Sequence, residues 1–142
     1  MTMARILAVD FGSRRVGVAV SDPLGIIALP LDTLHVGSRE EAVRQIVSLC
    51  RSYEAATVIM GYPLGNSGNK TAQTRVVDAV IRMIEERSGL PVVKWDERYT
   101  SVQAEDMLRS QGVGLREQKG RIDAMAARII LQEYLDTRGG AR

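Results

Sequence analysis

The sequence has only one cysteine and one histidine among its 142 residues. A single cysteine excludes a disulfide framework, and one residue of each type excludes a zinc site built from cysteine and histidine. Cys50 is therefore expected to be a small core residue, and a reducing, cytoplasmic setting fits. No apolar run approaches the roughly 18 residues of a membrane span, and the N-terminus lacks a secretory leader, so no membrane partner is expected.

Aromatic residues are also scarce, with one Trp, four Tyr and one Phe, so the core must consist mainly of aliphatic side chains and Met. Hydrophobic residues make up 45% of the chain, which is enough for one core, and we expect residues 1–142 to form a single domain. The net charge of +2 permits a polyanionic partner without arguing strongly for one.

The order of apolar segments predicts an α/β fold. Strands are predicted at 4–11, 16–21, 26–34, 56–60 and 90–95. Helices are predicted at 38–53, 71–87, 101–111 and 117–136, followed by a flexible tail from about residue 137. The first three strands form an antiparallel meander, Pro30 assigns the third to an edge, and the result is a five-stranded mixed sheet with helices on both faces.

Three acidic residues stand where this fold can gather them. Asp10 ends the first strand, Glu97 follows the fifth, and Asp123 lies near the start of the last helix. Right-handed crossovers place the later strands parallel to the first, so Asp10 and Glu97 reach one edge of the sheet and the helix can lay Asp123 over it. Carboxylates in such positions are costly unless paired or bound to metal, which indicates a divalent metal site for phosphodiester chemistry.

Each acid also has a plainer interpretation. Asp10 can bond to the following turn, and Asp123 can be a first-turn acid that the helix dipole favours. However, Asp123 shares its helix face with Ala126, Ala127 and Ile130, which should pack on the sheet. Strand alternation sends Asp96 and Glu97 to opposite faces and does not choose between them.

Four segments resemble the YqgF family, also called RuvX, within the ribonuclease H-like nucleases. They are 8–12 with 15–19, 61–63 with Gly68, 96–101, and 119–124 with 126–127 and 129–131. The resemblance implies a five-stranded ribonuclease H-like domain and a nuclease that matures the 5′ end of the small-subunit (pre-16S) ribosomal RNA precursor. It also implies kinship with Holliday junction resolvases and maps the family's metal-binding acids onto Asp10, Glu97 and Asp123. Glu97 rather than Asp96 is thus the expected ligand, and two Mg²⁺ or Mn²⁺ ions roughly 4 Å apart are the expected cofactor.

Basic and aromatic residues near these acids are candidate contacts to nucleic acid. Phosphate binding is expected from Arg14, Arg15, Arg98, Lys119 and Arg121, although each is also an ordinary surface or ion-pair residue by type. Tyr62 and Tyr99 can stack on unpaired bases, whereas Trp95 is expected in the core. The polar loop 65–70 precedes a helix and is expected to be flexible in the absence of substrate.

The leading hypothesis is a metal-dependent endonuclease acting on structured RNA, with pre-rRNA and ribosomal particles as partners and a monomer or weak homodimer as the working form. A resolvase of branched DNA is the alternative, and it requires a dimer to present two sites. An actin-like ATPase needs a second domain for which 142 residues leave no room. A non-catalytic nucleic-acid-binding factor in transcription or ribosome assembly is the remaining hypothesis.

Overall fold

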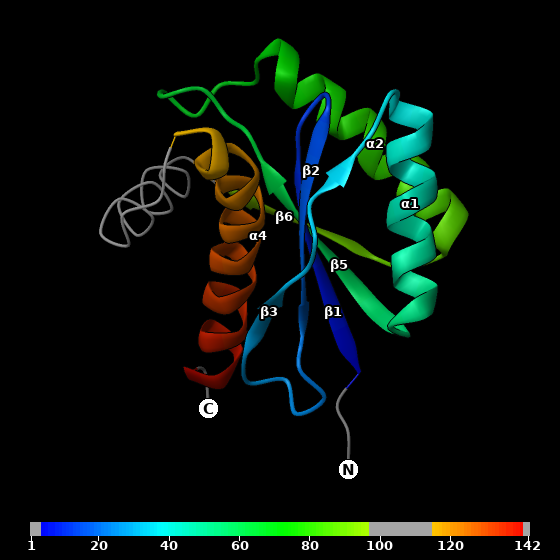
Figure 1. Ribbon diagram of the computed structural model, residues 1–142, viewed down its shortest axis with the longest axis vertical. Coiled ribbons are helices and arrows are strands. Elements are labelled where there is room, and N and C mark those ends of the chain that lie inside the picture. Colours follow the sequence, from blue (N-terminus) through cyan, green and yellow to red (C-terminus); the bar gives the residue numbers. More distant parts are fainter. Residues whose placement is uncertain (1–3, 97–114, 141–142) are drawn as a thin grey trace.

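The computed structural model describes residues 4–96 and 115–140, with side chains for 4–96 and 124–137. In this part of the chain the strands form one mixed sheet in the order β3-β2-β1-β5-β6, with β4 also paired to β2 (Figure 1). Its long strands are β1 (Arg5–Phe11), β2 (Arg15–Ser21), β5 (Ala55–Tyr62) and β6 (Val92–Asp96). β1 is antiparallel to β2 and parallel to β5, and β5 is parallel to β6, so the predicted α/β fold is confirmed.

The predicted third strand is two short strands in the structure. β3 (Ala28–Pro30) pairs with the end of β2, and β4 (Leu34–His35) pairs with its beginning. Among residues 4–96 the sheet therefore has six strands, because one of the five predicted strands is divided in two. Pro30 has no backbone N–H to donate and belongs to the outermost strand, as its position in the sequence predicted.

The first two helices begin at side-chain caps. α1 (Arg39–Ser52) starts after Ser38, whose Oγ accepts a hydrogen bond from Glu41 N–H at 3.1 Å. The Glu41 carboxylate accepts from Gly37 N–H at 3.2 Å rather than from Ser38 N–H, so only half of the expected capping box forms. α2 (Ala72–Ser88) starts after Thr71 and ends at Gly89, whose φ of 72° is a conformation that favours glycine.

The last helix, α4 (Leu115–Gly140), has 26 residues and extends past its predicted end at 136. The tail expected from about residue 137 is thus helical as far as Gly140. Asp123 lies more than two turns after Leu115, so it is not the first-turn acid that a helix-dipole explanation requires. The helix predicted at 101–111 lies outside the described residues. None of the helices that the structure describes is both long and apolar enough to cross a bilayer.

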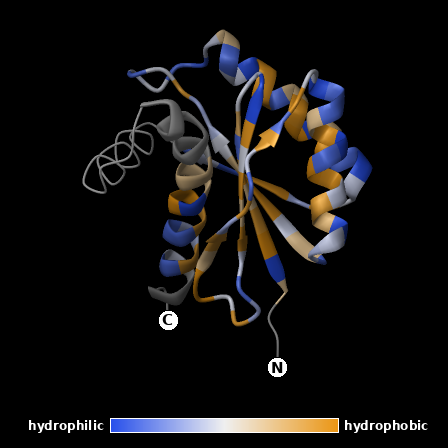
Figure 2. Cartoon of the chain, in the orientation of Figure 1, coloured by the Kyte–Doolittle hydropathy of each residue, from blue (hydrophilic) through white to orange (hydrophobic). Residues whose placement is uncertain are grey.

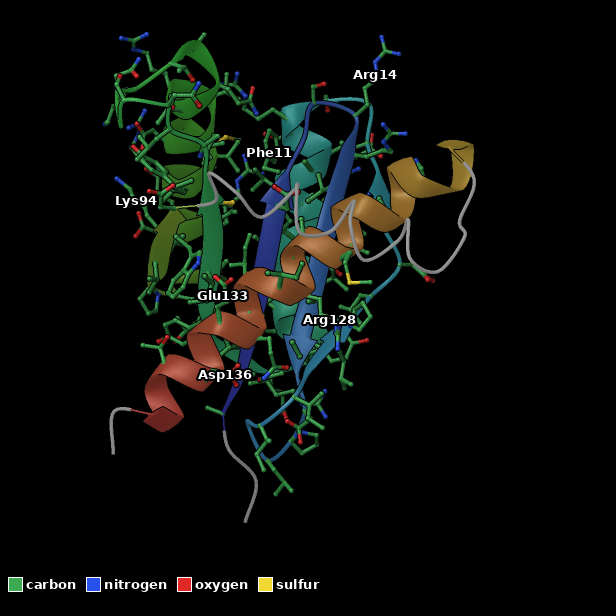
Figure 3. All side chains as sticks on the ribbon, turned by 90° about the vertical axis from the view of Figure 1, so that its left-hand side faces the viewer. Phe11, Arg14, Lys94, Arg128, Glu133 and Asp136 are labelled. Carbon is green, nitrogen blue, oxygen red and sulfur yellow. The ribbon has the colours of Figure 1, made fainter. Side chains whose placement is uncertain are left out.

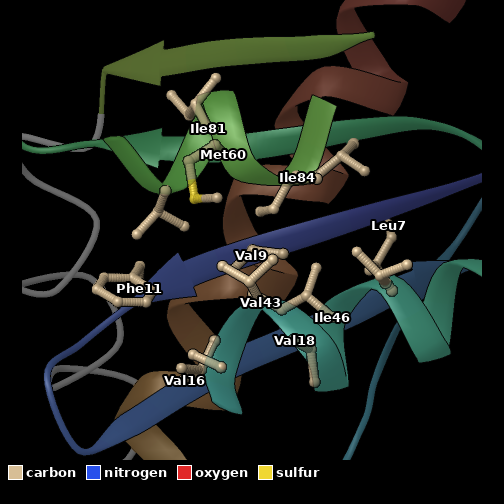
Figure 4. Packing of buried hydrophobic residues seen from close by; sticks show 14 of the residues in the cluster. Leu7, Val9, Phe11, Val16, Val18, Val43, Ile46, Met60, Ile81 and Ile84 are labelled. Carbon is tan, nitrogen blue, oxygen red and sulfur yellow. The ribbon is translucent and has the colours of Figure 1, made fainter. Parts of the chain in front are cut away.

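Helices cover both faces of the sheet. α1 and α2 lie on one face and α4 lies on the other (Figure 1), and hydrophobic residues run through the central strands between them (Figure 2). The larger cluster, between the sheet and α1 and α2, includes Leu7, Val9, Val18, Ile46, Met60 and Ile84 (Figure 4). The smaller cluster, under α4, includes Ile6, Ala8, Ala19, Ile59, Ala127 and Ile130. Cys50 belongs to the larger cluster, as its prediction as a core residue required.

Candidate functional site

Asp10 lies near the carboxyl end of β1, in the interior of the sheet. Along this strand Leu7 and Val9 pack toward α1 and α2, whereas Ile6 and Ala8 pack toward α4. Strand alternation therefore places Asp10 on the face that α4 covers. Its side chain is half-buried, so it stays within reach of solvent and of a ligand at this edge.

The residues level with Asp10 on both neighbouring strands are glycines. Gly17 is paired with Asp10 across the hairpin, and Gly61 follows Met60, the partner of Val9 in β5. A glycine has no side chain to cover the sheet face, so these positions leave the surroundings of Asp10 uncrowded by their own strands. Both glycines stood in the segments that resemble the nuclease family, but their position beside Asp10 required the strand register.

Gln132 fixes α4 against the opposite end of the sheet. Its Oε1 accepts a hydrogen bond from Ala28 N–H at 2.9 Å, and its Nε2 donates to Ile26 O at 2.9 Å. Ala28 pairs with Ser21, whose Oγ accepts from Ile6 N–H near the start of β1. As residue numbers fall from Gln132, α4 runs back toward the carboxyl end of β1 (Figures 1 and 3).

Asp123 lies on α4, and its side chain lies outside the described part. It precedes Ala126, Ala127 and Ile130 by three, four and seven residues. All three are buried, with exposed fractions of 1% or less, so the expectation that this face packs on the sheet is confirmed.

Glu97, Arg98 and Tyr99 lie outside the described residues, immediately after β6. Trp95 is partly buried under α4, where its ring meets Tyr134 edge-on at 6.0 Å between centroids and its Nε1 donates to Glu133 at 3.3 Å. The next residue, Asp96, is exposed and by alternation lies on the opposite face from Trp95 and Asp10. Asp96 is therefore separated by the sheet from the face that carries Asp10.

The hairpin between β1 and β2 presents arginine beside this edge. Arg14 is exposed and points away from the sheet (Figure 3), whereas Arg15 is partly buried at the start of β2. Gly12 makes the tight turn possible, since a Cβ there would lie 2.5 Å from the carbonyl oxygen of Arg15. Lys119 and Arg121 occupy α4, but their side chains, like Arg98, lie outside the described part.

A polar network at the carboxyl ends of β5 and β6 was not anticipated from the sequence. Tyr62 Oη donates to Asp78 Oδ1 at 2.8 Å, and Lys70 Nζ donates to Asp78 Oδ2 at 3.1 Å. Lys94 Nζ lies 3.5 Å from Asp78 Oδ1 and 4.9 Å from the centre of the Tyr62 ring. Burial opposes the charge of Asp78, but hydrogen bonds from Tyr62 and Lys70 outweigh it and lower the pKa of this carboxyl.

The network corrects the expectation that Tyr62 stacks on bases. The Tyr62 side chain is buried, with 7% exposed, and its ring lies under Lys94. The neighbouring loop is also ordered by its own backbone: Gly65 N–H donates to Asn69 O and Gly68 N–H donates to Gly65 O, each at 2.8 Å. Gly68 has a φ of 84°, which favours glycine at this turn.

Among the described side chains, no three acidic, histidine or cysteine residues gather closely enough to hold a metal ion. Asp10 on its own fits such a role, because it is a hard oxygen donor that is half-buried at the edge of an otherwise apolar sheet face. Mg²⁺ and Mn²⁺ bind through a few carboxylates together with water. Glu97 and the side chain of Asp123, the other two predicted ligands, lie outside the described part.

The sheet order and the antiparallel opening strands, with an acid on a central strand, define a ribonuclease H-like α/β fold. Solved structures agree. RuvC from Thermus thermophilus, in complex with a Holliday junction substrate, matches with a TM-score of 0.64 and 15% identity over 97% of each chain. The fowlpox virus resolvase, in complex with Holliday junction DNA, matches with a TM-score of 0.61 and 14% identity over 94% of this chain and 98% of the resolvase.

Sequence comparison defines the family. The family model described as "RuvX: Holliday junction resolvase" matches residues 4–137, so the chain belongs to the RuvX family. A "Putative pre-16S rRNA nuclease" of Syntrophus aciditrophicus is 41% identical over 93% of this chain and 88% of its own length. A protein of the same name from Chloroflexus aurantiacus is 44% identical over 94% of this chain and 87% of its own length.

Proposed function

We propose that the chain is a divalent-metal-dependent endonuclease whose metal ligands are Asp10, Glu97 and Asp123. The observation that carries this proposal is the shared face of the sheet. Asp10 lies on the face covered by α4, and Asp123 precedes the buried Ala126 and Ala127 by three and four residues, a spacing that would put it on the stripe of α4 that packs on this face. A carboxylate on each side of one interface is the arrangement that a shared cation stabilises.

Distances along the two elements support this arrangement. Gln132 is level with the start of β1, through Ala28 and Ser21. From Gln132 to Asp123 the helix rises by about 13 Å, at roughly 1.5 Å per residue. From Ile6 to Asp10 the strand advances by about 13 Å, at roughly 3.3 Å per residue. Both paths lead toward the carboxyl edge, which supports a placement of Asp10 and Asp123 at a similar height.

Glu97 completes the proposed set through strand alternation. Trp95 packs under α4 and Asp96 lies on the other face, so a residue 97 that continued the strand would return to the face of Asp10. Asp10 would be the central metal ligand, because its strand is paired on both sides. Glu97 and Asp123 would each bind metal on one side of Asp10. Two divalent cations, when bound, supply activation of water and charge stabilisation at the leaving oxygen.

The proposed substrate is structured RNA, and in particular the 5′ region of a pre-16S ribosomal RNA precursor. The support comes from two relatives named putative pre-16S rRNA nuclease, which are 41% and 44% identical over more than nine-tenths of this chain. Arg14, Arg15, Arg98, Lys119 and Arg121 would contact phosphates around the scissile bond. We propose that residues 1–142 act as one cytoplasmic domain, as a monomer or weak homodimer, on RNA that is naked or held in ribosomal particles.

The test compares purified wild-type, Asp10→Asn and Asp123→Asn proteins on precursor ribosomal RNA with Mn²⁺. Both variants should lose cleavage by at least about 100-fold while unfolding at nearly the wild-type denaturant concentration. The exposed Asp32 lies between β3 and β4, and Asp32→Asn is the matched control that should cleave normally. Cleavage by Asp10→Asn at the wild-type rate would exclude this metal site.

Resolution of branched DNA is the second candidate, because the matching family model carries the description Holliday junction resolvase. Two symmetric cuts require two copies of the site, and therefore a dimer. Sedimentation measured together with cleavage of a four-way junction distinguishes the two activities. Paired cuts by a dimer would support resolution, whereas a monomer that cuts precursor RNA and leaves junctions intact would support RNA processing.

A further inference from the structure

The geometry points to a second phosphate-binding site, formed by Lys70 and Lys94 on the α2 side of the sheet edge. This site would bind the nucleic-acid backbone outside the proposed metal centre. The nature of its ligand rests on the proposed function, whereas the arrangement of the lysines does not.

Lysine is rare in this chain, which has sixteen arginines and only three lysines. Two of the three meet at one carboxylate, although they are 24 positions apart in sequence. Lys70 Nζ lies 3.1 Å from Asp78 Oδ2, and Lys94 Nζ lies 3.5 Å from Asp78 Oδ1. The compact ammonium group of lysine binds phosphate as a point charge.

The cluster keeps a surplus of positive charge at the surface. One lysine is enough to neutralise Asp78, so the second leaves a net charge of about +1 on the group. The side chains of Lys70 and Lys94 are 56% and 50% exposed, whereas that of Asp78 is only 15% exposed. A ligand from solvent therefore meets ammonium groups first and the carboxylate last.

The lysines are also held in place before any ligand arrives. The Asp78 carboxylate is fixed by Tyr62 Oη at 2.8 Å, and the Tyr62 ring supports Lys94 at 4.9 Å from its centre. Hydrogen bonding to Asp78 and to Tyr62 raises the pKa of Lys70, so this ammonium stays charged at neutral pH. Side chains that are already ordered lose less conformational entropy when they bind.

Strand register places Lys94 close to the proposed metal centre. Lys94 pairs with Met60, and Met60 pairs with Val9, the neighbour of Asp10. Two strand spacings correspond to about 10 Å across the sheet. Asp10 faces α4 and Lys94 faces α2, so a strand bound at both sites would cross the carboxyl ends of β5 and β6. Figure 3 shows Lys94 and Arg14 on either side of this edge, with Phe11 between them.

The test measures binding of a short fluorescent single-stranded RNA in chelator, so that cleavage plays no part. The variant is Lys70→Gln/Lys94→Gln, and Lys70→Arg/Lys94→Arg keeps the charge. Arg51→Gln/Arg82→Gln removes the same charge from exposed positions on α1 and α2 outside the network. The same DNA sequence is tested in parallel, because both backbones offer phosphate.

Loss of two phosphate contacts should reduce the slope of log affinity against log salt by about 1.4 for a single strand. Between about 50 and about 200 mM salt, the fall in affinity should therefore shrink by roughly sevenfold. The arginine-for-lysine variant should keep the wild-type slope, and the Arg51 and Arg82 control should change it much less. RNA and DNA should respond alike.

An unchanged slope in Lys70→Gln/Lys94→Gln would overturn the inference, and so would an equal change in the Arg51 and Arg82 control. If the double variant does not fold, Lys94→Gln alone should reduce the slope by about 0.7, and no reduction would count against the site. Wild-type protein that binds RNA but never cleaves it would contradict the proposed nuclease and leave this site standing.

Discussion

The side chain of Gln132 completes the hydrogen bonding of Ala28, 104 residues earlier in the chain, by accepting its backbone N–H at 2.9 Å. The same amide donates to Ile26 O, so one residue of α4 satisfies two backbone groups of the segment that enters β3. These bonds determine where α4 rests on the sheet. They therefore influence where the helix places Asp123.

Gln132→Ala should lower the free energy of unfolding by about 1–3 kcal/mol, because it leaves the part-buried Ala28 N–H without its partner. Gln45→Ala is the matched control, since Gln45 donates to Glu41 within the same helix, α1. Urea denaturation followed by circular dichroism measures both. Equal midpoints for the two variants would contradict the anchoring role.

Ser21→Ala should lower stability by a similar amount, about 1–3 kcal/mol. The Ser21 hydroxyl is fully buried and accepts Ile6 N–H at 2.9 Å, where the pairing of β1 with β5 shifts register. Removing the hydroxyl leaves the buried Ile6 N–H without its acceptor. Ser48→Ala, at an exposed position of α1, should change stability little in the same denaturation assay.

Ala127→Leu tests whether close packing of α4 matters for activity. Ala127 is fully buried against the sheet, and the larger side chain should cost about 1–3 kcal/mol and displace the helix. Ala42→Leu makes the same change under α1, on the other face. Both variants should be less stable than the wild type, but only Ala127→Leu should also cleave more slowly. Cleavage is measured at a temperature at which both variants remain folded.

Asp22 should make stability sensitive to acid. Its carboxylate accepts backbone N–H groups of Ile27 and Ile26, at 2.8 Å and 2.7 Å, and these bonds lower its pKa below 3.8. A lowered folded-state pKa stabilises the fold above the unfolded-state pKa, and this contribution is lost as pH falls through the folded value. The difference in Tm between wild type and Asp22→Asn should therefore be largest near neutral pH and shrink below about pH 4. A difference that is constant with pH would contradict this role.

Cys50 should react slowly in the native state, because burial raises the pKa of its thiol to about 11 and only 3% of the residue is exposed. Iodoacetamide should label the native protein slowly and the urea-unfolded protein completely, as mass spectrometry can measure. Rapid labelling without denaturant would show that the layer under α1 opens readily.

Local patterns predicted much of the fold. Apolar segments at 4–11 and 16–21, separated by a turn at 12–15, predicted the hairpin. Pro30 predicted an edge, and Ser38 predicted the start of α1. The break of 26–34 into β3 and β4 depends on how this segment meets β2, which a local pattern does not encode.

The candidate site was predictable only in part. Asp10 stood out because a carboxylate ended an apolar strand. The meeting of Lys70 and Lys94 at Asp78 did not, because it depends on the register of β6 beside β5 and on the docking of α2. The bonds of Gln132 to Ile26 and Ala28 likewise arise from tertiary placement. Polar contacts between distant segments carry no periodic signal.

Among the described elements, α4 alone covers one face of the sheet, whereas α1 and α2 together cover the other. Substitutions on the sheet-facing side of α4 should therefore change both the thermal stability and the rate of cleavage, because repacking there would shift the proposed reaction centre. The solvent-facing surfaces of α1 and α2 do not combine these two roles. Stabilising substitutions should therefore be sought there first, and amino-acid substitutions in natural relatives should accumulate fastest there.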